Sequence, residues 1–193
     1  MTGVQTCALP IFGRVLSTQA ANPERTLVIG AYGLGKCQRV IKLLRLAGYD
    51  RTIYLHGAHS AMCDLYVKLG HYLGRLALVS EAAEKPGSLA GEIVLAPPSA
   101  LKDRWSRRLT DPITAFASGW MRVRARAQQR GVELPLIISD HADWPELIET
   151  IGDVGADEIW VTHGREDALV YQIGKMGRRG KALALVGFDD EGD

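Results

Sequence analysis

The feature that most constrains the fold is the alternation, from Thr26 onward, of short apolar runs with longer helix-like segments. Residues 26–31 and 52–55 predict strands, and the segments at 35–47 and about 60–73 predict helices. Further short strands are expected at residues 76–79, 92–95 and, more weakly, 113–117. Strands that alternate with helices are typical of parallel sheets, so we predict an α/β fold with a mostly parallel sheet.

A second α/β stretch follows, and we place the boundary around Gly131, giving domains at 12–131 and 132–193. Strands are predicted at residues 134–138, 158–161 and 182–186, with helices beginning near Trp144 and Arg165. Asp143 and Glu146 have the spacing of a capping box, which predicts a helix start. So short a segment buries little apolar surface, so we expect it to need a covering partner.

The first eleven residues, 1–11, resemble the translation of a sequencing adapter joined to a truncated reading frame. We therefore expect them to be non-native and to lie outside the fold. With 47% hydrophobic and 23% charged residues, the rest is typical of a globular protein. Its apolar runs are far shorter than the roughly 20 residues of a membrane span, and its three cysteines form no C-x-x-C pair. We expect a cytoplasmic protein without membrane association.

The formal net charge is only +1, but arginines are concentrated in one segment. They are Arg104, Arg107, Arg108, Arg122, Arg124, Arg126 and Arg130. Such a cluster suits phosphate contacts, because guanidinium groups match phosphate oxygens. A solvated helix surface is the alternative, and charge alone favours it, because helix surfaces commonly carry arginine.

Two histidines follow successive predicted strands, His141 after 134–138 and His163 after 158–161. Residues that follow the carboxyl ends of neighbouring parallel strands lie along one rim, so we expect these rings to converge. Imidazole can transfer a proton or bind zinc, and both roles fit hydrolysis.

Two further patterns suggest other chemistry. Residues 30–37 match the P-loop pattern G-x-x-x-x-G-K up to its last position, where Cys37 replaces the hydroxyl that coordinates magnesium. A P-loop-like nucleotide-binding protein is therefore an alternative. His56, His59 and Cys63 could be metal ligands, although a strand end followed by a helix start explains them more simply.

Five motifs carry a resemblance to a known family. They are AYGLGKCQR at 31–39, LAPPSAL at 95–101, FASGW at 116–120, SDHADW at 139–144 and VTHG at 161–164. These motifs resemble the metallo-β-lactamase/β-CASP nucleases, in particular the bacterial DNA ligase-associated exonucleases related to the nuclease that trims messenger RNA 3′ ends. The resemblance implies that 12–131 is a β-CASP domain and that 132–193 completes a metallo-β-lactamase fold.

The resemblance also implies a function and a set of roles. It implies a zinc-dependent nuclease with two zinc ions, which is expected to act as a DNA exonuclease in repair, with DNA favoured over RNA and an association with a DNA ligase. It assigns catalysis to His141, together with Asp140, and zinc ligation to His163. We expect substrate contacts from residues of the other motifs and the arginine segment, namely Lys36, Ser99, Arg122 and Arg124. For Lys36 a structural role is the alternative.

The family's H-x-H-x-D-H zinc motif is not in this sequence. One matched zinc ligand, His163, cannot hold two metals, since a stable site needs three or four protein ligands per zinc. We therefore expect a fragment that lacks a metallo-β-lactamase half, binds no zinc and is inactive alone. A non-catalytic nucleic-acid-binding module remains the other alternative.

Overall fold

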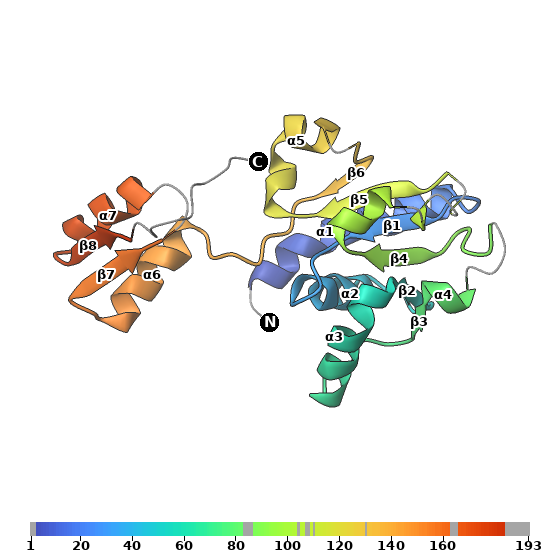
Figure 1. Ribbon diagram of the computed structural model, residues 1–193, viewed down its shortest axis with the longest axis horizontal. Coiled ribbons are helices and arrows are strands. Elements are labelled where there is room, and N and C mark those ends of the chain that lie inside the picture. The colour runs from blue at the N-terminus through green and yellow to red at the C-terminus, as the bar shows by residue number, and fades with distance from the viewer. Residues whose placement is uncertain are drawn as a thin grey trace. The chain divides into compact units, whose positions relative to one another are not determined.

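The computed structural model describes residues 3–82, 87–103, 105–106, 109, 111–129, 131–162 and 166–183. The chain divides into two compact units (Figure 1), the first ending at Asp140 and the second beginning at His141. The division lies later than the boundary predicted around Gly131, because the strand after Gly131 pairs with the sheet of the first unit.

The first unit is built on a six-stranded sheet in which every pair of neighbouring strands is parallel. Its strand order is β3-β2-β4-β1-β5-β6. The strands are β1 (Leu27–Gly30), β2 (Ile53–Leu55), β3 (Leu76–Leu78), β4 (Ile93–Ala96), β5 (Ile113–Ala117) and β6 (Leu134–Leu136). The predicted α/β class with a mostly parallel sheet is confirmed.

Helices and 3₁₀ turns precede and connect these strands. They are α1 (Gly3–Ala21), α2 (Lys36–Leu46), α3 (Gly57–Lys68), α4 (Val79–Ala82), η1 (Pro98–Lys102), η3 (Gly119–Arg122) and α5 (Arg124–Gln129). The helix predicted at 60–73 begins earlier, at Gly57, because His56 caps it, and it ends earlier, at Lys68.

The two faces of the sheet are covered differently. Every residue of β1 and β4 is buried, as expected of central parallel strands. On one face Ile29 and Leu95 pack in a core that includes residues of α1, α2 and α3. On the other face Val28 and Val94 pack under α4, η1 and the adjoining segments. The described helical pieces over the second face are short.

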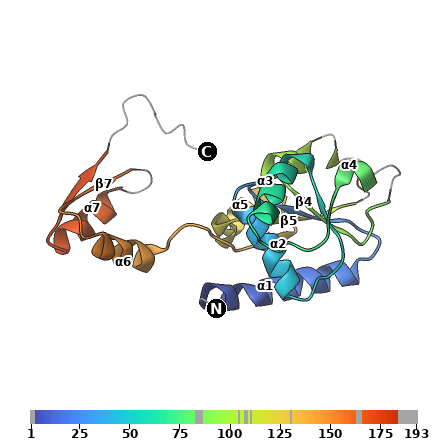
Figure 2. The same ribbon diagram turned by 90° about the horizontal axis from the view of Figure 1, so that it is seen from below.

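The start of α1 corrects one expectation. Residues 3–11 are helical, although we expected residues 1–11 to lie outside the fold. Their helix continues into Phe12 and Val15, which are fully buried in the sheet core. Figures 1 and 2 both show α1 beside α2, against which it packs. The contacts of Phe12 and Val15 with the sheet core thus hold α1 on the first unit.

The second unit contains a two-stranded parallel sheet and two helices: α6 (Trp144–Val154), β7 (Glu158–Val161), α7 (Glu166–Lys175) and β8 (Arg179–Ala182). The predicted capping box is confirmed, with Asp143 and Glu146 each accepting from the other's backbone N–H. The strand predicted at 182–186 is wrong in position, since β8 begins at Arg179 in register with β7, and residues 184–186 lie outside the described ranges.

The described residues of this unit form a small core, whose buried members are Ile151, Val161 and Ile173. Trp160 and Tyr171 are about two-thirds exposed, at 63% and 67%. The expectation that this unit needs a covering partner stays a prediction.

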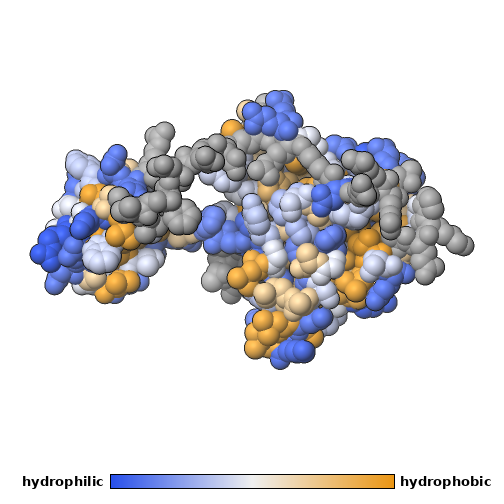
Figure 3. All heavy atoms as spheres, viewed as in Figure 1, coloured by the Kyte–Doolittle hydropathy of each residue, from blue (hydrophilic) through white to orange (hydrophobic). Residues whose placement is uncertain are grey.

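Apolar surface is also exposed on the first unit. Figure 3 shows apolar side chains gathered around α3, where Leu65, Val67 and the C-cap residue Leu69 are between 46% and 67% exposed. None of the described helices is long and apolar enough to cross a membrane.

Candidate functional site

Because all strands of the first unit are parallel, the residues that follow them gather at one edge of the sheet, here called the carboxyl edge. The chain leaves β1 toward β2 on one side of the sheet order and leaves β4 toward β5 on the other. Neighbouring strands whose connections run to opposite sides in this way form a switch point, beyond which α/β proteins commonly bind ligands. The loops after β1 and β4 lie at this switch point.

Three charged side chains meet at the carboxyl edge, beside the start of α2. Lys36 Nζ lies 3.3 Å from Asp140 Oδ2 and donates a hydrogen bond to the carbonyl oxygen of Ile138, at 3.2 Å. Arg39 Nη1 lies 2.9 Å from Asp140 Oδ1 and donates to the carbonyl oxygen of Ser139, at 2.7 Å. Two cations of α2 therefore hold the segment that follows β6.

The two cations differ in accessibility. The Lys36 side chain is only 7% exposed, so its ammonium group depends on these partners, because a buried charge is costly without them. Its placement favours a structural role over the substrate contact that we predicted. Arg39, at 28%, is more accessible. We did not select Arg39 from the sequence, although its spacing of three residues from Lys36 places both on one side of α2.

Exposed aromatic side chains lie along the same edge. Tyr32 follows β1 and is 56% exposed, and Trp120 follows β5 in η3 and is 60% exposed. The Tyr32 ring meets Phe116 edge to face, with ring centroids 6.5 Å apart. The Ser118 hydroxyl accepts a hydrogen bond from the Trp120 backbone N–H at 3.3 Å, which fixes the start of η3. The edge therefore offers large aromatic surfaces beside a cation.

The glycine-rich loop between β1 and α2 lacks the arrangement of a nucleotide-binding P-loop. Cys37, at the position of the magnesium-binding hydroxyl, is fully buried, and Lys36 is paired with Asp140. Gln38 Nε2 donates to the carbonyl oxygen of Gly33 at 2.9 Å and so braces the loop from within. Gly35 has a φ of 76°, a left-handed conformation that favours glycine. The loop residues thus have structural functions.

A buried thiol pair lies behind this loop, where α2 faces α3. The hydrogen bond between Cys37 and Cys63 raises the pKa of Cys37 and lowers the pKa of Cys63 to about 7. Burial raises both values, and Gln38 Nε2, 3.5 Å from Cys63 Sγ, lowers that of Cys63. Both thiols are fully buried, so neither faces a ligand site.

His56 and His59 have separate structural surroundings. His56 Nδ1 accepts a hydrogen bond from the Ala58 backbone N–H at 3.2 Å and caps α3, which confirms the simpler interpretation. His59 is 1% exposed, and within the described chain neither ring nitrogen has a hydrogen-bond partner of normal geometry. Burial lowers the pKa of His59 below its usual 6.5, His56 lowers it further, and the Ala96 backbone opposes them.

The remaining predicted site residues are placed as follows. His141 is exposed and precedes α6 in the second unit, whereas His163 lies outside the described residues. The expected convergence of the two rings therefore stays a prediction. Arg122 is exposed at the end of η3. Arg124 begins α5, and its side chain lies outside the description.

Of the arginine cluster, only the side chain of Arg122 lies within the described residues. Outside them lie the side chains of Arg104, Arg107, Arg108, Arg124, Arg126 and Arg130.

Within the described ranges no three His, Cys, Asp or Glu side chains come together as a metal site. The described residues thus do not form a zinc site, and we assign no metal-dependent step to them.

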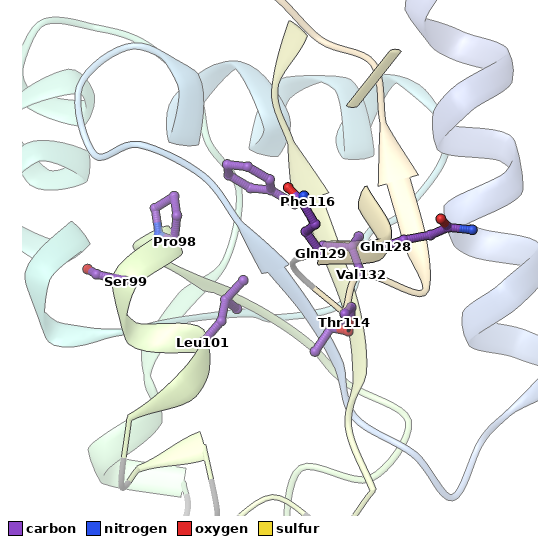
Figure 4. Close-up of a pocket in the computed structure, with 9 residues that line it drawn as sticks. Pro98, Ser99, Leu101, Thr114, Phe116, Gln128, Gln129 and Val132 are labelled. Carbon is purple, nitrogen blue, oxygen red and sulfur yellow. Dashed lines mark hydrogen bonds between the residues drawn. The ribbon is translucent and has the colours of Figure 1, made fainter. Parts of the chain in front are cut away.

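A cavity of about 690 Å³ lies on the second face of the sheet, between η1, β5 and α5. Figure 4 shows η1 on one side, Gln129 and Val132 on the other, and Phe116 between them. Ser99, which we predicted to contact substrate, lines the cavity, but its hydroxyl points away from Gln129 in this view. The other lining residues are Pro98, Leu101, Thr114, Gln128 and Gly131.

The floor of the cavity depends on a close approach at Gly30. Gly30 is paired with Phe116 across the sheet, and a Cβ at Gly30 would lie 2.8 Å from Leu101 Cδ1 and 3.1 Å from Phe116 Cδ2. A side chain here would overlap Leu101 and lie in tight contact with Phe116. The absence of one lets Leu101 and Phe116 meet over β1.

Comparison with known proteins finds one DNA-related relative. The chain is 23% identical over 137 residues to a probable DNA ligase of Opitutus terrae. The alignment covers 71% of this chain and 13% of the ligase. No family model matches the chain.

Removal of the Asp140 carboxylate should destabilise the first unit. We expect Asp140→Asn to lower the free energy of unfolding by about 1–3 kcal/mol, because the buried Lys36 ammonium loses its carboxylate. Asp111→Asn, which alters the exposed ion pair with Arg25, should cost less than about 1 kcal/mol. Urea unfolding measures both, and equal losses would contradict the structural role of Lys36.

His59 should make stability fall in acid. The unfolded chain binds a proton at His59 near pH 6.5, whereas the folded chain does so only at lower pH, so protons favour the unfolded state. The uncharged His59 contributes fully to the free energy of unfolding above about pH 6.5. This contribution is lost as the pH falls below that value, at up to about 1.4 kcal/mol per pH unit. The free energy of unfolding in urea should therefore differ less between about pH 7.5 and pH 5.5 for His59→Gln than for the native chain. His71→Gln, at an exposed site, is the control, and a native-like difference in His59→Gln would refute the assignment.

Proposed function

We propose that this chain is the nucleic-acid-binding part of a zinc-dependent nuclease that acts on DNA. The observation that carries the proposal is the carboxyl edge, where exposed Tyr32 and Trp120 flank a sheet edge that also bears Arg39 and Arg122. Cations that follow a phosphate backbone, with aromatic rings on which bases stack, are typical of proteins that bind single strands. The similarity to a probable DNA ligase supports DNA as the nucleic acid.

The catalytic part of the proposal rests on the family resemblance. We propose that His141 donates a proton to the leaving oxygen, for which its exposed position is suitable. Asp140, held by Lys36 and Arg39, fixes the chain directly before His141 and is thus assigned a positioning role. His163 would be one zinc ligand, and the remaining ligands would come from a complete nuclease. Association with a DNA ligase, exonuclease polarity and a role in repair belong to the same proposal.

DNA binding by this chain tests the first part. We expect salt-sensitive binding of single-stranded DNA, measured by fluorescence anisotropy at several salt concentrations. Arg39→Gln and Arg122→Gln should each weaken binding and reduce the salt slope by about one. Arg75→Gln is the matched control, because Arg75 precedes β3 at the opposite edge of the sheet. Absence of any DNA binding at low salt would refute this part.

Cleavage tests the second part and requires a protein in which this sequence is joined to an H-x-H-x-D-H half. Such a protein should cleave DNA with zinc, whereas the present chain alone should not. His141→Ala should lower kcat by about 10²–10⁴-fold, the usual contribution of proton transfer, and His163→Ala should lower the zinc content. Unchanged cleavage in both variants would show that the two roles are misassigned.

A further inference from the structure

Binding of the phosphate backbone of DNA at the carboxyl edge does not account for the cavity between η1, β5 and α5. Its volume of about 690 Å³ lies within the range of about 300–1,000 Å³ that is usual for pockets that bind small molecules. Two of its lining residues, Leu101 and Phe116, pack over Gly30, which has no side chain to keep them apart. The cavity thus lies beside residues that follow β4 and end β5.

The described lining residues suit an uncharged ligand. None of the nine has a charged side chain. Pro98, Leu101, Phe116 and Val132 give the cavity apolar walls. A ligand held by these residues would bury apolar surface against them.

The polar groups are few and directional. Figure 4 shows the amide of Gln129 beside Phe116, whereas the side chain of Gln128 points away from it. A glutamine amide presents one acceptor and one donor group side by side. The Thr114 hydroxyl, which donates to the Gly131 carbonyl at 3.0 Å, retains its acceptor lone pairs. The cavity thus combines flat apolar walls with an adjacent donor and acceptor.

We infer that this cavity binds a single unstacked nucleobase. A base is neutral, has two apolar faces and carries donors and acceptors side by side on its edges, and glutamine matches the N6 and N7 edge of adenine. Pro98 and Leu101 pack against one side of the base, and Gln129 hydrogen-bonds its edge. The inference rests on the proposed function, because it supplies the base-binding subsite of a strand whose backbone lies on the carboxyl edge.

The test uses 2′-deoxyadenosine, which carries no phosphate and therefore bypasses the carboxyl edge. Titration of the ¹⁵N-labelled chain should shift the amide signals of Phe116, Gln129 and Val132 in a saturable manner. Gln129→Ala should weaken this binding about tenfold, and Val132→Trp, which fills the cavity, should abolish it. Lys42→Ala, at an exposed position of α2 on the other face of the sheet, is the control and should bind as the native chain does.

A second probe separates this inference from the proposed function. A ten-unit abasic phosphodiester has the backbone charge but no bases, so the native chain and Gln129→Ala should bind it equally. Loss of abasic binding with retained nucleoside binding would refute the carboxyl edge and leave the cavity intact. Absence of saturable shifts with deoxyadenosine, shifts at residues remote from the cavity, or native-like binding by Val132→Trp would each overturn the nucleobase assignment.

Discussion

The burial of β1 and β4 on both faces is the constraint on which the rest of the first unit depends. Strands that are apolar on both sides need cover above and below, and parallel strands need crossover connections that supply it. These connections bring every strand end to the same edge. The charged and aromatic residues of the candidate site lie together because the core is built in this way.

At that edge, the fold determines which charged side chains are accessible to a ligand, and the sequence alone does not reveal it. Lys36 looks like a ligand-binding cation because it follows a glycine-rich loop, yet its ammonium group is committed to Ile138 and Asp140. Arg39, one turn on, remains partly accessible. Desolvation thus decides which of two neighbouring cations can meet a solvent-borne anion.

The sequence predicted the α/β class and most strands because buried β-branched runs and capping signals are local. It placed β8 wrongly, since Arg179 and Lys181 are not apolar and pairing with β7 determines that strand. It did not predict that 3–11 would be helical, because the anchoring contacts of Phe12 are tertiary. The ion pair joins Lys36 and Asp140, which are about a hundred positions apart, and the cavity is lined by residues of several elements, so no local pattern predicts either of them.

The glycine at position 30 has a consequence for sequence variation. A side chain there must displace Leu101 or Phe116, which come from other elements of the same face. The sizes of the side chains at positions 30, 101 and 116 therefore constrain one another. In proteins of this lineage a larger residue at one of them should be accompanied by a smaller residue at another, so covariation at these three positions would record the shape of the hollow.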